Sequence, residues 1–278
     1  MSRVLVGEGL HRTHVENPLM RESLVDSAVL AATESDKIWA MLPDVAVVGL
    51  GGRSILDRGA SAILPMRDEI VRNHKDGRKL ILGVGTGVRG RHTLTIGLDL
   101  GIPVGGLAAC VGAVEEQNLR MLLAVLAPYG GMHLIRDFLG QLPMYVETGM
   151  IPISIGIPPY RFWEPPPEQG HLPINGPDVG LYHLAETIGA RQMIFCKDVD
   201  GIYTDDPAKN PDAKPLPHRI SVAELLALDL PDLPIERAAL ELLQNARLVR
   251  EFQIIDGLVA GNLTRALAGE KIGTTVHQ

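Results

Sequence analysis

The chain has 278 residues, of which 46% are hydrophobic and only 4% are aromatic. This composition excludes intrinsic disorder, and the length suffices for one large α/β domain or two smaller ones. The formal net charge is −7 at pH 7, so no overall charge attracts the chain to nucleic acid or to an anionic membrane. An anionic ligand therefore needs a local cluster of cations.

The N-terminal sequence MSRVLVGEGLHRTHVENP has no uninterrupted apolar segment and no small-residue cleavage site, so we expect no signal peptide. No apolar stretch approaches the ~20 residues of a membrane span. Cys110 and Cys196 both lie in apolar stretches, and we expect buried free thiols, which suit a reducing compartment. These features predict a soluble, cytoplasmic protein.

Residues 1–43 are expected to form an N-terminal arm that precedes the first strand–helix unit. Between Met20 and Leu42, apolar residues recur at spacings of three and four, which predicts an amphipathic helix followed by a less regular piece. The apolar face of that helix would pack on the body of the chain or form an oligomer contact with a neighbouring subunit.

From residue 44 to residue 278, segments with the pattern of strands alternate with segments with the pattern of helices. We expect strands at 45–50, 79–84, 132–135, 151–157, 192–196, 252–256 and 273–278. We expect helices at 57–74, 115–126, 179–189, 221–228, 235–250 and 263–269. The proline-rich residues 158–178 predict a loop with a functional or assembly role. The alternation predicts an α/β fold with a mainly parallel sheet that is covered on both faces.

Three turns directly follow predicted strands and contain residues suited to a phosphate. The first holds Gly51-Gly52-Arg53, the second Gly85-Thr86-Gly87 with Arg89 and Arg91 behind it, and the third spans 197–207. In open α/β sheets, ligands bind beyond the C-terminal strand ends, where helix N-termini direct their amides outward. Each turn alone can be purely conformational, but three in order indicate a phosphate site.

The third turn adds one cation, Lys197, and several carboxylates, among them Asp198, Asp200 and Asp206. A cation near carboxylates at a strand end is typical of a magnesium–triphosphate site. Neither the P-loop motif nor the Rossmann glycine motif occurs, which disfavours those nucleotide-binding folds.

The order of these motifs resembles the amino-acid-kinase superfamily, which includes uridylate kinases and aspartokinases. The matching segments are the glycine pair, GTGVRGRH, Asp178-Val179-Gly180 and KDVDGIYTDDP, of which the last is the most specific. Within the superfamily, the chain is similar to the molybdenum storage proteins from about Leu42 to the C-terminus. The segments that carry this likeness are GGRSILDRGASAILP, GVRGRHTLTIGLDLGIPVG, PPYRFW, QMIFCKDVDGIYT and IIDGLVAGNLTRALAGEKIGT.

The resemblance implies a three-layer αβα sandwich on a sheet of about eight strands, assembled as a homo- or hetero-hexameric cage with a related subunit. Such a cage binds ATP with Mg²⁺ and holds polynuclear molybdenum or tungsten oxide clusters. It implies that Lys197 contacts the triphosphate as the catalytic residue and that Asp198 lies by the magnesium. The implied nucleotide-binding residues are Gly51, Gly52, Arg53, Gly85, Thr86, Gly87, Arg89, Lys197, Asp200, Gly201, Tyr203 and Asp206.

Contacts to an oxide cluster are harder to read from the residues. Candidates are Glu115, Glu116, Gln117 and Asn118 at the start of a predicted helix, and His133 soon after it. The alternative is that Glu115 and Glu116 are simply acids in a first helical turn, where they stabilise the helix.

One departure from the superfamily concerns activity. Members usually carry a lysine two residues before the glycine pair, and this chain has Gly49 there. The change removes a cation expected to stabilise the transferring phosphoryl group, and the fork of Arg53 is not equivalent to a lysine. We therefore expect the chain to bind a nucleotide, and we do not expect efficient kinase turnover. The alternatives are a uridylate-kinase-like enzyme and a catalytically silent partner subunit.

Overall fold

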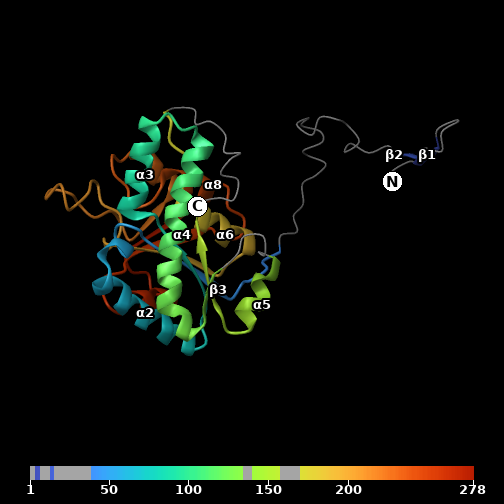
Figure 1. Cartoon of the computed structure of the whole chain (residues 1–278), viewed down its shortest axis with the longest axis horizontal. Helices are drawn as coiled ribbons and strands as arrows, with labels where there is room; N and C mark the ends of the chain where they lie inside the picture. The colour runs from blue at the N-terminus through green and yellow to red at the C-terminus, as the bar shows by residue number, and fades with distance from the viewer. Residues whose placement is uncertain (1–3, 7–12, 16–38, 134–139, 157–169) are drawn as a thin grey trace. The chain divides into compact units, whose positions relative to one another are not determined.

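The computed structural model describes residues 4–6, 13–15, 39–133, 140–156 and 170–278, which form two units, residues 1–39 and 40–278 (Figure 1). In the first unit, β1 (Val4–Val6) pairs antiparallel with β2 (Thr13–Val15). The helix predicted after Met20 and most of the proline-rich loop lie outside the described residues. No described helix has both the length and the apolar character needed to cross a membrane.

The second unit is built on an eight-stranded sheet. In spatial order the strands are β5 (Gly131–His133), β6 (Ile151–Ile155), β4 (Lys79–Val84), β3 (Val45–Leu50), β7 (Gln192–Lys197), β9 (Glu251–Asp256), β10 (Thr274–His277) and β8 (Arg219–Ser221). Only the β9–β10 pairing is antiparallel, so the predicted mainly parallel sheet is confirmed. The edge strand β8, which was not predicted, is three residues long and contains a single buried residue, Ile220, so no apolar run marks it in the sequence.

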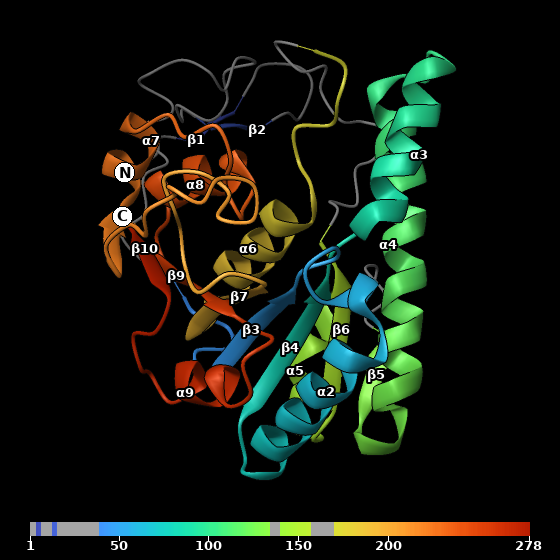
Figure 2. The same ribbon diagram turned by 90° about the vertical axis from the view of Figure 1, so that its left-hand side faces the viewer.

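Helices cover both faces of this sheet. They are α2 (Ala60–Lys75), α3 (Gly87–Asp99), α4 (Val104–Leu126), α5 (Leu142–Glu147), α6 (Pro177–Ile188), α7 (Val222–Ala227), α8 (Arg237–Gln244) and α9 (Asn262–Leu267), with short 3₁₀ turns at Leu56–Arg58 and Ala127–Tyr129. Helices α3 and α4 lie side by side in both views (Figures 1 and 2). A capping box of Ser221 and Glu224 opens α7.

Two of the predicted helices have different bounds in the structure. Helix α4 begins at Val104, well before Glu115, so Glu115 and Glu116 lie in the middle of the helix and not in its first turn. Helix α8 ends at Gln244 instead of continuing to residue 250. The carboxylate of Glu186 accepts the backbone N–H groups of residues 247–249 at 2.7–3.2 Å. Those amides therefore have an acceptor outside a helix, and the helical pattern does not extend to them.

The core consists of two apolar clusters, one on each side of the sheet. Along β3, Val45 and Val47 belong to the cluster under α5–α8, whereas Ala46, Val48 and Leu50 belong to the cluster under α2, α4 and α9. This alternation follows the two-residue period of a strand. It gives the three-layer αβα arrangement predicted from the sequence.

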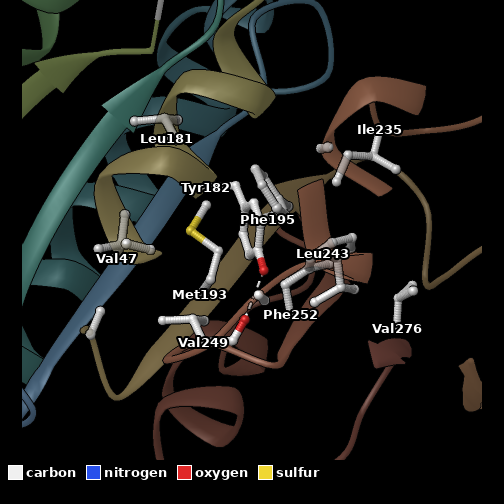
Figure 3. Packing of buried hydrophobic residues seen from close by; sticks show 14 of the residues in the cluster. Val47, Leu181, Tyr182, Met193, Phe195, Ile235, Leu243, Val249, Phe252 and Val276 are labelled. Atoms are coloured by element: carbon white, nitrogen blue, oxygen red, sulfur yellow. Dashed lines mark hydrogen bonds between the residues drawn. The ribbon is translucent and has the colours of Figure 1, made fainter. Parts of the chain in front are cut away.

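Three aromatic rings anchor the first cluster (Figure 3). The centroid of Phe252 lies 5.7 Å from that of Tyr182 and 5.4 Å from that of Phe195, both in edge-to-face geometry. The Tyr182 hydroxyl donates a hydrogen bond to the Val249 carbonyl at 2.8 Å. Three of the chain's eleven aromatic residues thus pack together between β7, β9 and α6, next to the third phosphate-type turn.

The two cysteines have different environments. Cys196 in β7 is buried, and burial raises the pKa of its thiol. Cys110 is exposed on α4, which contradicts the expectation that both thiols are buried. Ala108 and Val111 of the same helix face the core, and the 3.6-residue period directs Cys110 away from it.

Candidate functional site

A cavity of about 770 Å³ lies at the C-terminal ends of β3, β4 and β7. Because these strands run parallel, their C-terminal ends meet at one edge of the sheet, and the three turns come together there. Eleven predicted site residues line the cavity: Gly51, Gly52, Arg53, Gly85, Thr86, Gly87, Lys197, Asp198, Gly201, Tyr203 and Asp206. Other predicted residues, namely Arg89, Asp200, Glu115, Glu116 and Gln117, lie elsewhere in the described part of the chain.

The first two turns pack backbone against backbone. A Cβ atom on Gly52 would lie less than 3.0 Å from the amide nitrogen of Gly87, and one on Gly87 would lie equally close to the Asp57 carboxylate. Gly87 also has a φ of +69°, which side chains rarely tolerate. Glycine is therefore required for this close approach, and it exposes main chain to the cavity. Asp57 accepts the Val88 amide at 2.6 Å, so part of the N-terminus of α3 already has an anionic partner.

Residues of α4 hold the second turn from behind. Asn118 donates hydrogen bonds to the carbonyl oxygens of Gly85 at 2.7 Å and Thr86 at 3.2 Å. Arg89 donates to Asn118 and, at 3.3 Å, to Gln117. Arg89 and Gln117 are thus one layer removed from the cavity, where they fix the turn that forms its wall. The role of Asn118 was not predicted, because nothing in the local sequence couples it to residues 85–86.

Lys197 is the cation at the centre of the third turn. Its Nζ donates to both carboxylate oxygens of Asp178, at 2.9 and 2.8 Å, and lies 5.6 Å from the centre of the Phe195 ring. The two paired side chains are only 12% and 14% exposed, so water screens this ion pair less than a surface pair. Asp178, at the start of α6, was noted as a motif residue but not as a site residue.

The carboxylates of the third turn each have a partner. Asp198 accepts a hydrogen bond from Arg58 at 2.8 Å. Asp200 accepts from the Tyr203 hydroxyl at 2.5 Å, which raises the pKa of Tyr203. Asp206 accepts the Ala208 amide at 2.9 Å, and this bond holds the pKa of its carboxyl below the usual value. No group of three or more His, Cys, Asp or Glu side chains within the described ranges is arranged to hold a metal ion.

Glu236 is a further acidic residue of the cavity wall that sequence reasoning missed. Its Oε2 accepts the Val179 amide in the first turn of α6 at 3.0 Å. Burial, and next the negative charge of Asp178, raise the pKa of Glu236 to about 8. In the sequence, Glu236 is a polar residue at the start of a predicted helix, with no motif around it. Its contact with α6 depends on the tertiary structure.

The residues predicted to touch an oxide cluster are spread around α4. Glu115 is fully buried and accepts the Gly156 amide. Glu116 pairs with Arg120 at 2.6 Å. Gln117 contacts Arg89, and the side chain of His133 lies outside the described part. Their role toward a cluster stays a prediction.

Gly49, where the superfamily usually has lysine, lies inside β3. A Cβ atom there would lie 3.0 Å from Phe195 Cδ1 and 3.2 Å from Leu181 Cδ1. Gly83 on the neighbouring strand faces the same leucine. Position 49 therefore points toward apolar side chains, and the nearest cavity-lining cation on this turn is Arg53.

The profile of the amino acid kinase family matches residues 44–250, which include most of both cores and all three turns. The chain belongs to the amino acid kinase family. One relative of this chain is molybdenum storage protein subunit beta of Azotobacter vinelandii. The two are 42% identical over 262 residues, which cover 94% of this chain and 96% of the relative. A uridylate kinase of Mycobacterium sp. (strain KMS) is 38% identical over 122 residues, covering 39% of this chain and 45% of that enzyme. The resemblance to the molybdenum storage proteins is therefore confirmed.

Solved structures of the family share the fold. Uridylate kinase from Archaeoglobus fulgidus superposes with a TM-score of 0.65 at 21% identity, covering 83% of this chain and 99% of that one. UMP kinase from Bacillus anthracis gives a TM-score of 0.65 at 18% identity, covering 84% and 96%. At such identities the likeness shows the fold alone, and it confirms the predicted amino-acid-kinase architecture.

Proposed function

We propose that this chain is an ATP-binding subunit of a storage assembly that holds molybdenum or tungsten as polynuclear oxide clusters. The observation that carries the proposal is the 42% identity to a molybdenum storage protein subunit over 94% of this chain. The likeness to uridylate kinases is weaker, at 38% identity over 39% of the chain for one of them and 28% identity over 65% of the chain for another. Similarity across the whole length extends beyond the nucleotide site, and it therefore favours the storage function over a shared nucleotide fold alone.

Nucleotide binding is supported by the make-up of the cavity. Its glycine turns expose main chain, and four cations, Arg53, Arg58, Arg91 and Lys197, stand among six carboxylates of the lining. Two of these cations already have a carboxylate partner, Lys197 in Asp178 and Arg58 in Asp198. We assign the triphosphate to the side of Gly52 and Lys197, and the base and ribose to the side of Tyr203 and Asp206. A volume of about 770 Å³ suits a ligand of nucleotide size.

Mg²⁺ fits this donor set as an ion shared between protein and nucleotide. Mg²⁺ is commonly held by one or two carboxylates together with substrate phosphates, and the Asp198 carboxylate at the cavity wall is suited to that role. When bound, the ion would neutralise charge on the phosphates. Arg58 donates to Oδ2 of Asp198, and a bound ion would share this carboxylate with Arg58.

Efficient transfer to a small-molecule acceptor is disfavoured by the surroundings of Gly49. A phosphoryl transfer site needs cations on the transferring group, and position 49 supplies none. We infer that any ATP turnover serves metal loading, with Lys197 as the residue that contacts the phosphates. The second candidate is a uridylate-kinase-like enzyme, favoured by the matches in sequence and fold. A catalytically silent partner of an active subunit is the third.

We further propose assembly with copies of this chain or with a related subunit into a hexamer, in which residues 1–43 form an oligomer contact. The Azotobacter vinelandii relative is a subunit, beta, of its storage protein, which supports a multi-subunit assembly. The exposed free thiol of Cys110 suits a reducing compartment, which supports a cytoplasmic location.

Two assays separate the candidates. Purified protein is incubated with Mg-ATP and UMP, and formation of UDP is followed. In parallel, protein incubated with molybdate or tungstate and Mg-ATP is desalted and its metal content measured. Retained metal without UDP formation supports storage, whereas UDP formation without retained metal supports the kinase.

A further inference from the structure

We propose that Glu236 is a proton-accepting group of the cavity, which takes up a proton when a phosphate-bearing ligand binds beside Lys197. The proposal rests on the nucleotide binding proposed above and adds a charge-balancing step to it. No covalent bond to the ligand forms or breaks in this step. A proton from solvent joins one carboxylate oxygen of Glu236.

The geometry that carries the inference is an imbalance of charge at one corner of the cavity. Lys197 is engaged by both oxygens of Asp178, on the first turn of α6. Glu236 accepts the amide of Val179, the next residue of the same helix. The Glu236 carboxyl is therefore held close to that of Asp178, while the only ammonium of the group is already paired.

Glu115 adds a third carboxyl from α4. It is fully buried, accepts the amide of Gly156, and its charge acts on Glu236. Within the described part of the chain, the charged groups that act on Glu236 include Asp178 from α6, Lys197 from β7 and Glu115 from α4. Its neighbour Arg237 points to Asp229, at 2.8 Å. Among the described residues, Asp178 and Glu236 thus share the ammonium of Lys197, and a carboxyl pair of this kind readily holds a proton.

The direction of titration agrees with this geometry. Burial and the charge of Asp178 raise the pKa of Glu236 to about 8, so in the ligand-free chain the carboxyl is partly ionised above that pH. A bound phosphate adds negative charge beside Lys197 and weakens the influence of that ammonium on the carboxyls. Both effects raise the proton affinity of Glu236, and ligand binding is then accompanied by proton uptake.

The test is calorimetric titration with Mg-ADP, a ligand that is not hydrolysed, at pH 8.5 in buffers of different ionisation enthalpy. The dependence of the heat on buffer gives the number of protons taken up. From a free pKa of about 8, we expect about half a proton or more per site in the wild type. Glu236→Gln keeps an oxygen for the Val179 amide and cannot ionise, so its uptake falls to nearly zero while binding persists. The control is Glu241→Gln, an exposed position of α8, which should behave as the wild type.

The same uptake in Glu236→Gln as in the wild type would overturn the proposal. Absence of any Mg-ADP binding by the wild type would instead overturn the nucleotide function and the uptake with it. A second experiment follows the titration of Glu236 in the absence of ligand. It compares infrared spectra of the protein at pH 7 and pH 9.5. When the pH is raised, the protonated carboxyl of Glu236 loses its proton, and the difference spectrum shows the loss of one carboxylic-acid band. We expect this band in the spectra of the wild type and Glu241→Gln and not in that of Glu236→Gln. Circular dichroism checks that all three proteins are folded. Identical infrared difference spectra of the three folded proteins would contradict the assignment of this titration to Glu236.

Discussion

The side chain of Leu181 fills the space beside Gly83: a Cβ atom on Gly83 would lie less than 3.0 Å from Leu181 Cδ2. The same leucine approaches Gly49, so the two central strands carry paired glycines under one large side chain. A glycine in a strand often marks such a close approach. Here it allows α6 to dock closely on the sheet and to deliver Asp178 to the cavity.

Gly83→Ala is expected to lower the free energy of unfolding by about 1–3 kcal/mol, because the new methyl group overpacks a filled core. Adding Leu181→Ala should remove the clash, so the double variant should lose less than the sum of the two single losses. Urea unfolding of the four proteins measures the coupling. Strictly additive losses would show that Leu181 and position 83 do not compete for space.

Gly49→Lys tests whether a lysine at position 49 can act on a nucleotide. We expect the single variant to be less stable and to hydrolyse ATP no faster, because its side chain must first displace Phe195 and Leu181. Combined with Leu181→Ala, the lysine gains room to reach toward the cavity. A single variant that is fully stable and hydrolyses ATP faster would contradict the packing described for this position.

Lys197→Ala should weaken Mg-ATP binding by about 10- to 100-fold, since it removes a charge-assisted contact and leaves Asp178 as an uncompensated anion in the cavity. The matched control is Lys214→Ala, an exposed lysine of the following loop. Calorimetric titration compares both variants with the wild type. Unchanged affinity in Lys197→Ala would remove this residue from the phosphate site.

Gly52→Ala should weaken Mg-ATP binding by roughly 10-fold or more, because the methyl group forces apart the two turns that form the phosphate wall. Gly140→Ala is the control, since a Cβ atom there would meet no atom within 4 Å. Circular dichroism and the Mg-ATP titration separate loss of fold from loss of binding. Equal affinities of the two variants would argue against direct main-chain contact with phosphate in this turn.

The pH dependence of stability follows from the raised pKa of Glu236. The pKa of Glu236 is about 8 in the folded chain, against an ordinary value of 4.5, so between these two pH values the folded chain binds more protons than the unfolded chain. The stabilisation is complete below about pH 4.5 and is lost as the pH rises through 8, by up to about 5 kcal/mol in total. Urea unfolding between pH 5.5 and 9 should show this decline in the wild type and in Glu241→Gln. A decline of the same size in Glu236→Gln would assign it to other groups.

Much of the fold was predictable because its signals are local. The apolar runs of β3 and β7, and the turns that follow these strands, are read directly from neighbouring residues. The eight-stranded count and the αβα layers came from the resemblance to the superfamily. The predicted end of α8 was wrong. The backbone N–H groups of residues 247–249 donate to Glu186, which is remote in the sequence, and not to carbonyl groups of a continuing helix.

The candidate site was predictable only in part, for the same physical reason. Residues that form it through their own turn, such as Gly52 and Lys197, stand in recognisable motifs. Residues that reach it from other elements do not: Arg58 meets Asp198, Asn118 supports Gly85, and Glu236 joins α6 through tertiary contacts. No short-range pattern encodes such pairings.

The storage function is tested most directly by elemental analysis of the purified oligomer after incubation with molybdate or tungstate, with and without Mg-ATP. The protein is desalted before measurement, and the experiment is repeated with a co-expressed related subunit. The proposed function predicts many metal atoms per subunit, accumulated only when Mg-ATP is present, and strongly reduced in Lys197→Ala. No retained metal in either preparation, while Mg-ATP binds normally, would contradict storage and leave a nucleotide-binding member of the amino acid kinase family.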